Sequence, residues 1–443
     1  MTYSKILESA LIPAYYKLRG RTYPRLREFM ERSQWWSRDQ IVDFQWREAR
    51  MLLEHAFHSV PYYQTKYAAV GIELGDVKTR KDFARLPPLT REEVNEHRAE
   101  LCSRDHKGRL LPHATGGSSG VPTRFYITLD SYDWRCAASD RAYSWSGYRP
   151  GERALYLWGA PVGRVSRFKK VKLDGCRFLR RELVIPTFVQ TEEMWQSTFD
   201  AATRFRPMFL VGYVSSLEKF AEFLLAKNLT IPGIQAVLAA AEPVYSSTRD
   251  LVFRAFQVPL FDTYGSREFM SIAAECEEHD GLHIHSENLL TETENNTKGL
   301  GGQILITDLH NYGMPFIRYR IGDLGSLSDS DCPCGRRLPL INRIEGRVLE
   351  VLRTVEGRII PGEFFPHLMK EIDEVQEYQV HQRSLEEVVL SVVLARPFSE
   401  NSEKLLRQEM ARVFTPRTRV TINPVKAIPK LPSGKRRLTI GLS

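Results

Sequence analysis

The sequence is short of cysteine and has no long apolar run. Six cysteines in 443 residues are too few for a disulfide-stapled scaffold, which indicates a reducing, cytoplasmic setting. No stretch of about 20 apolar residues occurs, so no membrane-spanning helix is expected. The first residues also lack the continuous apolar core of a secretory signal, because Lys5, Pro13 and Lys17 interrupt them.

Positive charge exceeds negative charge only slightly. The net charge is +8, and the basic residues are dispersed apart from a denser stretch at 164–181. That stretch also carries apolar residues and is most simply a solvated face. No aromatic-basic recognition motif accompanies the positive charge. Nucleic-acid binding is therefore a distant alternative, and no nucleic-acid partner is expected.

The length exceeds what one compact core usually holds, which indicates more than one domain. Apolar spacing predicts a helix over 41–58, ended by Pro61-Tyr62-Tyr63. Further along, strand and helix patterns alternate, as is typical of parallel α/β layers. The expected strands are 124–128, 154–158, 208–211, 236–240 and 259–263, and the expected helices are 131–146, 215–227 and 246–256.

Past residue 280 the pattern changes to short strands, expected at 282–285, 302–307 and 316–319. A break near Gly346 separates a smaller α+β unit of a plausible domain size. We therefore predict two domains, residues 1–345 and 346–443. In the second domain the expected strands are 348–353, 378–381, 387–394 and 419–423, and the expected helices are 364–372 and 402–414.

A glycine-rich segment from Thr115 to Pro122 is the most informative part of the sequence. Its three glycines permit unusual backbone angles and close approach to a ligand, and its hydroxyls and amide groups can surround phosphate oxygens. No lysine follows the last glycine, so the segment is not a Walker loop. It predicts a phosphate-binding loop, with a flexible loop that holds no ligand as the plain alternative.

The same segment contains Gly116-x-Ser118-x-Gly120, the nucleophile-elbow pattern of serine hydrolases. An elbow lies between a strand and an immediately following helix. Pro122 and the β-branched and aromatic residues up to residue 127 oppose a helix at that place. A serine hydrolase using Ser118 is therefore kept only as a distant alternative.

Further motifs follow the loop in order, and together they resemble the acyl-CoA synthetase and adenylating-enzyme superfamily from about His113 to the end. The glycine-rich loop is similar to the superfamily's phosphate-binding loop, whose usual form is Thr-Ser-Gly-Thr-Thr-Gly-x-Pro. Within the superfamily the chain most resembles phenylacetate-CoA ligase, coenzyme F390 synthetase and the CapK-like proteins. The remaining motifs are Ala241-Glu242-Pro243, Asp262 to Glu268, Arg318 to Asp323, Gly346-Arg347 and Pro429 to Lys435, with Gly212-Tyr213-x-Ser215 and Cys332 to Arg336 as marks of that branch.

This resemblance implies an α/β fold, with a large N-terminal domain of α/β layers and a distorted β-barrel, then a small mobile α+β domain. It implies ATP-dependent activation of a carboxylic acid to an acyl-AMP, with Mg²⁺ as the metal cofactor. The first hypothesis for the acyl acceptor is CoA. The alternative is an amine or hydroxyl, as in an amide- or ester-forming ligase of polysaccharide or cofactor biosynthesis. The expected partners are thus a small acid and an acceptor, and monomer or homodimer stays open.

The resemblance also implies roles for single residues. Lys435 would bridge the carboxylate and the α-phosphate, Glu268 would bind Mg²⁺ and Asp323 would accept hydrogen bonds from the ribose. With Arg347, Lys435 and Glu268 form the expected catalytic set. Nucleotide-binding residues are expected at Thr115, Gly116, Gly117, Ser118, Ser119, Gly120, Ala241, Glu242, Pro243, Asp262, Thr263, Tyr264, Gly265, Ser266, Arg267 and Asp323. Acid-binding residues are expected at Tyr156, Trp158 and Tyr213, which fit an aryl or arylalkyl acid unless they are simply core residues.

Two departures from the superfamily pattern bear on function. Arg267 stands where the family often has a hydroxyl residue, so an arginine could contact phosphate there. Leu349-Glu350 occupies the hinge position that usually carries an Asp pair. In the family this hinge swings the C-terminal domain between two half-reactions. The altered hinge weakens the case for CoA and keeps the other acceptors open.

Cysteine and histidine gather in the β-rich part. Cys276, His279, His283 and His285 lie close in sequence, and Cys332-x-Cys334 follows later. Some relatives resemble this arrangement and carry structural zinc. Three thiolates and one imidazole would make a tetrahedral zinc shell, and His283 is the preferred fourth ligand because Leu282 and Ile284 alternate around it. The expected zinc ligands are Cys276, His283, Cys332 and Cys334, with free thiols and surface imidazoles as the alternative.

Overall fold

The computed structural model describes residues 3–115, 123–158, 167–187, 192–297, 301–328, 330–347, 352–356, 374–429 and 438–442, with residues 359, 360, 365, 368, 369 and 372. None of the described helices is both long and apolar enough to cross a bilayer.

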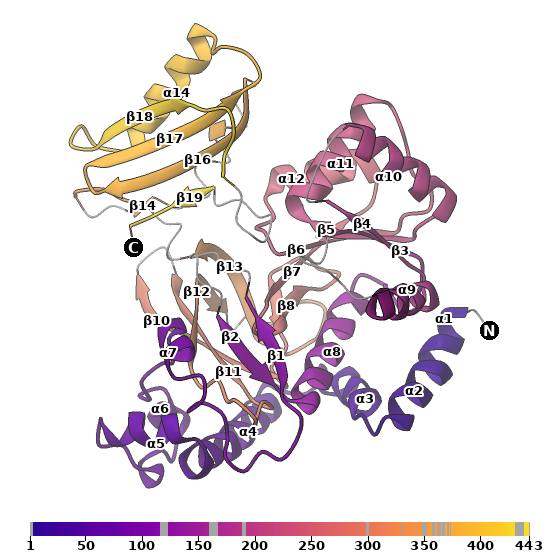
Figure 1. Cartoon of the computed structure of the whole chain (residues 1–443), viewed down its shortest axis with the longest axis vertical. Coiled ribbons are helices and arrows are strands. Elements are labelled where there is room, and N and C mark those ends of the chain that lie inside the picture. The colour runs from indigo at the N-terminus through magenta and orange to yellow at the C-terminus, as the bar shows by residue number, and fades with distance from the viewer. Residues whose placement is uncertain are drawn as a thin grey trace.

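The first hundred residues are helical and lie along the lower part of the molecule (Figure 1). The predicted helix at 41–58 is confirmed as α4, which begins behind a capping box formed by Ser37 and Gln40. Pro61 follows the end of α4 and also starts α5, because proline suits the first turn of a helix. The helices here are α1 (Tyr3–Ile6), η1 (Leu7–Leu11), α2 (Ile12–Leu18), α3 (Tyr23–Ser33), α4 (Arg38–Ser59), α5 (Pro61–Ala68), η2 (Leu74–Asp76), α6 (Arg80–Phe83) and α7 (Arg91–Glu96).

An eleven-stranded sheet runs through the middle of the chain in the order β10-β11-β12-β13-β9-β8-β7-β6-β5-β3-β4. Strands β3 to β7 are parallel, and the alternation of strands and helices predicted for this part is confirmed. The elements are α8 (Leu129–Ser144), β3 (Ala154–Trp158), α9 (Arg167–Arg180), β4 (Glu182–Pro186), α10 (Glu192–Phe205), β5 (Phe209–Tyr213), α11 (Val214–Ala226), β6 (Ala236–Ala240), α12 (Ser246–Phe256) and β7 (Leu260–Ser266).

Each face of the parallel strands packs on a separate core. Leu155, Leu157 and Leu210 point to one face, where α10, α11 and α12 cover them (Figure 1). Residues one position along the strands, such as Phe209 and Val211, point to the other face and pack around Tyr148. Because both faces are buried, β3, β5 and β6 are apolar throughout rather than alternating. Packing on both faces therefore fixes the positions of the carboxyl ends of these strands, which is where parallel sheets bind ligands.

The antiparallel strands extend this sheet: β8 (Met270–Glu275), β9 (Leu282–Ile284), β10 (Leu289–Thr297), β11 (Gly301–Asp308), β12 (Tyr319–Ser328) and β13 (Leu340–Arg347). The hydrogen-bonded ladder of the described strands stays open, yet it curves strongly, as in the barrel that the resemblance implies. Tyr264 of β7 reaches Asp323 of β12 through one hydrogen bond although three strands lie between them. In a flat sheet those two strands would be about 19 Å apart.

One strand prediction in this part is wrong in its bounds. The segment 316–319 was expected to be a strand, but β12 begins only at Tyr319. Arg318 has a left-handed backbone with φ of 51°, which interrupts an extended chain. Its guanidinium is buried, pairs with Glu292 and donates to the carbonyl of Leu86. The apolar residues before Tyr319 are therefore buried without joining the hydrogen-bonded ladder of a strand.

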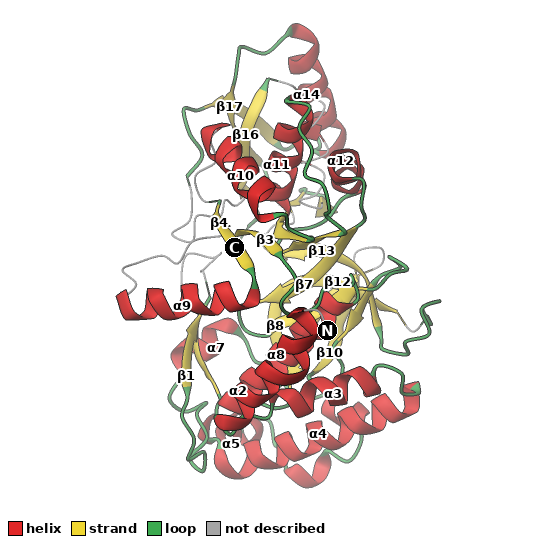
Figure 2. Cartoon of the chain, turned by 90° about the vertical axis from the view of Figure 1, so that its right-hand side faces the viewer, coloured by secondary structure: helices red, strands yellow, loops and turns green. Residues whose placement is uncertain are grey.

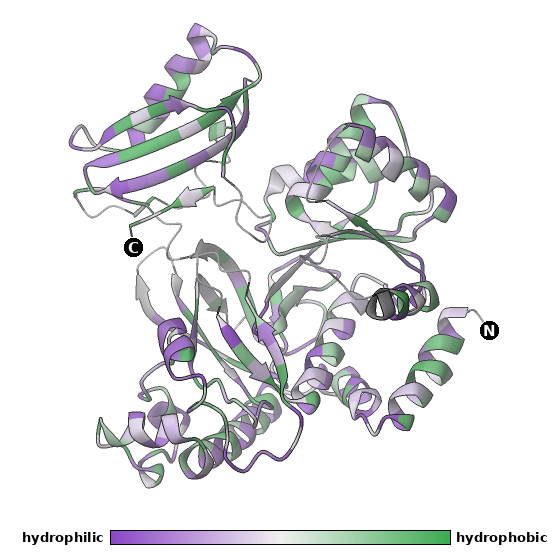
Figure 3. Ribbon diagram, in the orientation of Figure 1, coloured by the Kyte–Doolittle hydropathy of each residue, from purple (hydrophilic) through white to green (hydrophobic). Residues whose placement is uncertain are grey.

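The C-terminal part has its own core. Its sheet has the order β18-β17-β16-β19, and α14 packs on it (Figure 1). Much of α14 is hydrophilic (Figure 3), and its buried residues are Leu406 and Met410. The predicted boundary at 345/346 falls inside β13 and stays a prediction. The elements are β14 (Leu352–Arg353), β15 (Ile359–Ile360), β16 (Val375–Ser384), β17 (Glu387–Leu394), α14 (Glu400–Val413), β18 (Arg419–Pro424) and β19 (Thr439–Ile440), while most of the predicted helix 364–372 lies outside the described residues.

Candidate active site and metal centre

The hairpin of β7 and β8 carries the segment from Asp262 to Glu268. A side chain at Gly265 would clash with the carbonyl oxygen of Met270, and the strand register shifts at this point. Glycine is therefore required by the close approach of two backbones. Tyr264 and Glu268, which lie on either side of Gly265, both form hydrogen bonds with residues of β12.

Tyr264 and Asp323 meet across the curved sheet. The phenol of Tyr264 donates a hydrogen bond of 2.7 Å to Oδ2 of Asp323, whose side chain is buried. The two residues come from separate motifs, one in β7 and one in β12. A carboxylate has about four acceptor positions, so this bond leaves capacity for further hydroxyl donors. The structure thus brings together two of the residues expected at the nucleotide.

Glu268 is buried at the turn between β7 and β8. Its Oε1 accepts a hydrogen bond of 3.2 Å from the phenol of Tyr319 and lies 4.0 Å from the guanidinium of Arg91. Arg91, at the start of α7, was missed by sequence reasoning. The pattern Thr90-x-x-Glu93 does signal a helix start, and its capping box is present, but nothing local connects it to Glu268.

Glu242 has a structural contact beyond its expected nucleotide role. Its carboxylate accepts from the backbone N–H of Ser215 at 2.6 Å and from the Ser215 hydroxyl at 3.1 Å. These donors lie in the first turn of α11, where N–H groups lack partners within the helix. The preceding Ala241 has a left-handed backbone with φ of 68° at the end of β6, and Pro243 is exposed. The bond therefore joins the Gly212-Tyr213-x-Ser215 segment to the Ala241-Glu242-Pro243 segment.

Trp158 and Tyr213 form an aromatic wall at the carboxyl ends of β3 and β5. Their rings stack with centroids 4.5 Å apart and an interplanar angle of 30°. Tyr156 lies two residues before Trp158 on the same face of the sheet, but deeper, in the core around Tyr148. Burial holds its pKa well above the ordinary value. Of the three expected acid-binding residues, Trp158 and Tyr213 thus lie nearest the strand ends.

The two ends of the glycine-rich loop are paired with each other, and we call this paired segment the neck of the loop. Strands β1 (Leu111–Ala114) and β2 (Arg124–Ile127) pair antiparallel. Beyond them, the N–H of Thr115 donates to the Thr123 carbonyl at 3.0 Å, and the N–H of Thr123 donates to Oγ1 of Thr115 at 2.9 Å. The five residues Gly116, Gly117, Ser118, Ser119 and Gly120 lie outside the described residues.

This hairpin is the wrong context for a hydrolase elbow. An elbow requires a strand, a sharp turn at the nucleophile and then a helix. Here the segment around Ser118 is followed by the extended strand β2, and α8 starts only at Leu129. Arg267 borders the neck, because its Nε donates to the carbonyl of Ala114 at 3.3 Å. The basic side chain therefore lies at the base of the loop, as an anion site requires.

The remaining expected residues of β7 support the hairpin. The hydroxyl of Thr263 donates to the Ala239 carbonyl at 2.7 Å, and the hydroxyl of Ser266 accepts from the Phe269 N–H at 3.3 Å. The N–H of Asp262 donates to Glu275 at 2.8 Å. Burial, with the nearby charge of Glu275, raises the pKa of the Asp262 carboxyl to about 7.

The C-terminal expected residues are placed only in part. Arg347 ends β13, where its backbone lies opposite Asp323 in the ladder. Lys435 and the hinge residues Leu349-Glu350 lie outside the described residues. Their roles stay predictions.

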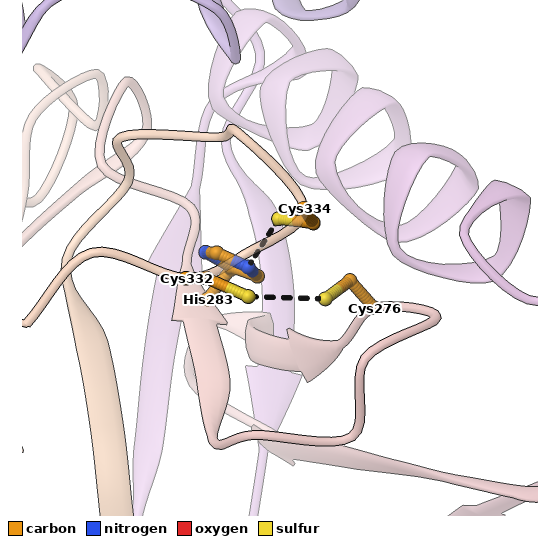
Figure 4. A group of neighbouring side chains, drawn as sticks. All are labelled: Cys276, His283, Cys332 and Cys334. Atoms are coloured by element: carbon orange, nitrogen blue, oxygen red, sulfur yellow. Dashed lines mark hydrogen bonds between the residues drawn. The ribbon is translucent and has the colours of Figure 1, made fainter.

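The four expected zinc ligands do come together (Figure 4). One ligand atom from each of Cys276, His283, Cys332 and Cys334 lies within 4.8 Å of all the others. The sulfurs of Cys276 and Cys332 are 3.6 Å apart, and Sγ of Cys334 is 3.3 Å from Nε2 of His283. Sulfurs on a tetrahedral zinc are about 3.8 Å apart, whereas a disulfide requires about 2.05 Å. The spacing fits a shared metal.

Protonation supports the same interpretation. Nδ1 of His283 lies 3.3 Å from the Leu338 carbonyl, which can only accept, so the proton is on Nδ1 and Nε2 presents a lone pair to the thiols. Burial raises the pKa of the Cys276 thiol and lowers the pKa of His283 to about 4. A dication would stabilise both deprotonated ligands. The residues therefore fit zinc.

The other two histidines of the segment have different partners. Nδ1 of His285 accepts from Arg141 at 3.0 Å, so the proton is on Nε2, which donates to the Ser271 hydroxyl at 2.9 Å. His279 lies beside Glu275 at 3.1 Å. Neither belongs to the cluster of ligand atoms among the described residues.

The end of the chain matches a known family. Residues 352–441, which contain β14 to β19, match the model of the CapK C-terminal domain. Two relatives span most of the chain: Protein CapK of Staphylococcus aureus is 24% identical over 82% of this chain and 81% of its own length. Phenylacetate-coenzyme A ligase of Thermus thermophilus is 23% identical over 91% of this chain and 97% of its own length.

Solved structures with a similar fold cover most of the chain. The crystal structure of 2-hydroxyisobutyryl-CoA ligase in complex with an acyl-AMP superposes with a TM-score of 0.67, at 20% identity, over 89% of this chain and 88% of that chain. The amide bond synthetase McbA of Marinactinospora thermotolerans gives 0.51, at 17% identity, over 75% and 68%. The predicted fold class, the adenylate-forming fold, is therefore confirmed.

Proposed function

We propose that this protein is an adenylate-forming ligase that activates a carboxylic acid with ATP. In the first half-reaction a carboxylate oxygen attacks the α-phosphorus, the bond to the leaving pyrophosphate breaks, and an acyl-AMP forms. In the second half-reaction a nucleophile attacks the acyl carbon, and AMP leaves with the electron pair of the broken bond. Both steps need positioning and charge neutralisation rather than covalent catalysis by the protein.

The observation that carries the proposal is the convergence of two distant motifs on one site. Tyr264 and Glu268 come from the β7–β8 hairpin, and Asp323 and Tyr319 come from β12, yet each residue of the first pair bonds one of the second. A buried carboxylate beside a phenol offers a directed acceptor for ribose hydroxyls. A second buried carboxylate, that of Glu268, offers an oxygen ligand for Mg²⁺, which would neutralise phosphate charge.

The phosphates would lie against the glycine-rich loop. Its neck is held by Thr115 and Thr123, and Arg267 borders it. Lys435 would complete the site from the CapK C-terminal domain by bridging the acid and the α-phosphate as a point charge. Arg347, at the end of β13, would act at the junction between the two parts.

The stacked pair Trp158 and Tyr213 favours a flat acid. Both rings stand at the carboxyl ends of parallel strands, which is where open α/β sheets bind ligands. Aromatic side chains offer large planar surfaces that pack on an aryl group. The proposed substrate class is therefore an aryl or arylalkyl carboxylic acid, with Tyr156 supporting the wall from beneath.

CoA is the acceptor that we propose first, because the phenylacetate-coenzyme A ligase of Thermus thermophilus matches 91% of the chain. A second candidate is transfer to an amine or hydroxyl. It is favoured by the match of residues 352–441 to the CapK C-terminal domain model, and by the replacement of the usual hinge Asp pair with Leu349-Glu350.

The metal centre would be structural. All four positions of a tetrahedral zinc would be taken by side chains, which leaves no open position for a substrate. Zinc there would join the β8–β9 turn to the loop before β13.

ATP–pyrophosphate exchange measured across a panel of carboxylic acids tests the proposal. We expect exchange that depends on a particular aryl or arylalkyl acid and needs no CoA. Adding CoA, or a panel of amines and hydroxyl compounds, to a reaction with that acid then identifies the acceptor by mass spectrometry of the product. Absence of exchange with every acid would refute adenylation.

A further inference from the structure

Helix α9 presents an apolar stripe to solvent. Val171, Phe178 and Leu179 are 72%, 82% and 54% exposed. At 100° per residue these three lie within about 100° of one another on the helix, so they form one face. Among residues 171–180, whose side chains are described, only Arg177 and Arg180 are half-buried. Figure 2 shows α9 projecting sideways from the body of the molecule.

The same helix is strongly basic. Between Arg167 and Arg181 the sequence has seven basic residues and one acidic residue, Asp174. Arg180 is neutralised by Glu182 at 2.9 Å, and Arg177 lies 3.8 Å from Asp174. Lys172 is exposed beside the apolar stripe. A solvated face of the kind expected from the sequence would bury its apolar residues, whereas α9 exposes the apolar stripe together with Lys172.

The first helix extends this surface. The phenol of Tyr3 donates to the Leu179 carbonyl at 2.6 Å, and the guanidinium of Arg181 lies over the Tyr3 ring at 5.4 Å. Tyr3 and the neighbouring Ile6 are 38% and 41% exposed. Figure 3 shows further hydrophobic residues along the helices at that terminus. The exposed apolar residues of α1 therefore adjoin those of α9 where Tyr3 meets Leu179.

We propose that α9, with α1, binds the surface of an anionic lipid bilayer. An exposed apolar stripe flanked by lysine and arginine is the pattern of a helix that lies in the membrane interface, with its apolar side chains among the acyl chains and its cations at the headgroups. Charge selects this occupant, because residues 167–182 hold seven basic and two acidic residues, and anionic headgroups complement this excess of five positive charges. A second copy of this helix would bring like charges together.

Cosedimentation with vesicles tests the proposal. The full-length protein is expected to bind mixed phosphatidylglycerol–phosphatidylcholine vesicles and to bind pure phosphatidylcholine vesicles far more weakly. Phe178→Ser is expected to weaken binding about tenfold or more, because the variant lacks the phenylalanine ring that the bilayer would bury. Phe253→Ser is the matched control, since Phe253 is 55% exposed on α12 at another surface. Lys172→Glu should weaken binding and Lys404→Glu, on α14, should not.

Each other outcome overturns the proposal. No binding to anionic vesicles refutes it, as does binding that Phe178→Ser leaves unchanged. Sedimentation equilibrium of the same proteins tests the other candidate occupant, which is a second copy of this chain. If the wild-type protein is a dimer and Phe178→Ser makes it monomeric without vesicles, the stripe is an interface between copies. Unchanged thermal unfolding of the variants shows that the fold is intact.

Discussion

The phenol of Tyr264 donates a hydrogen bond of 2.7 Å to Oδ2 of Asp323, and it joins β7 to β12 across three intervening strands. This bond orients the carboxylate that we assign to the ribose. Tyr264→Phe removes the donor and leaves the ring. We expect a KM for ATP raised about 5- to 10-fold with kcat little changed, because one hydrogen bond to a charged acceptor is lost.

ATP–pyrophosphate exchange at varied ATP concentration measures this effect. Asp323→Asn should raise the KM for ATP further than Tyr264→Phe, and the double variant should be no worse than Asp323→Asn, because the two residues act as one unit. Tyr312→Phe is the control, since the Tyr312 ring packs against His55 instead. Additive effects of the two substitutions would show that Tyr264 acts independently of Asp323.

Lys435 is expected to serve the first half-reaction. Lys435→Ala should reduce pyrophosphate exchange about 100-fold or more, because the transition state loses a positioned cation. The matched control is Lys426→Ala, an exposed lysine in the same domain. Supplying preformed acyl-AMP to the Lys435 variant should restore product formation with the acceptor. A variant with normal exchange would remove Lys435 from the catalytic set.

The cysteine–histidine cluster is expected to hold one zinc ion per chain. Elemental analysis of untagged protein measures the content directly. Cys334→Ser should lose the metal and lower the midpoint of thermal unfolding, because metal binding stabilises only the folded chain. Cys176→Ser is the control, since this thiol is exposed on α9. Zinc-free wild-type protein with unchanged stability would favour simple buried thiols.

His310 is expected to make the fold sensitive to acid. It stacks on Trp134 at 3.7 Å, donates to the Glu287 carbonyl at 2.8 Å, and faces Glu48 at 4.0 Å. Burial lowers its pKa from 6.5 to about 4. Between these pH values the unfolded chain binds more protons, so stability present above pH 6.5 is lost as the pH falls towards 4.

Chemical denaturation between pH 7.5 and 4 measures this loss. His310→Gln keeps a donor for the carbonyl but cannot take the proton, so its free energy of unfolding should fall less steeply than that of the wild type. The difference should approach about 1.4 kcal/mol for each pH unit below 6.5. His58→Gln, on the exposed face of α4, should leave the slope unchanged. Parallel curves for His310→Gln and wild type would contradict the prediction.

The strands and helices of the parallel layer could be predicted because their signals are local. Strands such as 154–158 and 236–240 are apolar throughout and bounded by segments with glycine or proline, so burial on both faces was visible in the sequence. The strand at 316–319 failed because Arg318 turns the chain for a tertiary reason, its buried pairing with Glu292. No local pattern records that requirement.

The same distinction holds for the site. Leu282-His283-Ile284 fixes the face of His283 by alternation alone, and the four metal ligands do gather in the structure. Arg91 and the bond of Glu242 to Ser215 could not be found that way, because each joins segments whose distance depends on the whole fold. Motif order located the residues, whereas only the folded chain shows which of them touch.

The threonine at the neck of the glycine-rich loop has a consequence for selectivity. Oγ1 of Thr115 already receives the N–H of Thr123, so the hydroxyl can offer its hydrogen outward more readily than its lone pairs. A neck with an outward hydroxyl hydrogen attracts anions and offers few lone pairs to a metal cation. Valine at this position would keep the shape and lose both the acceptor and the donor, whereas serine would retain them.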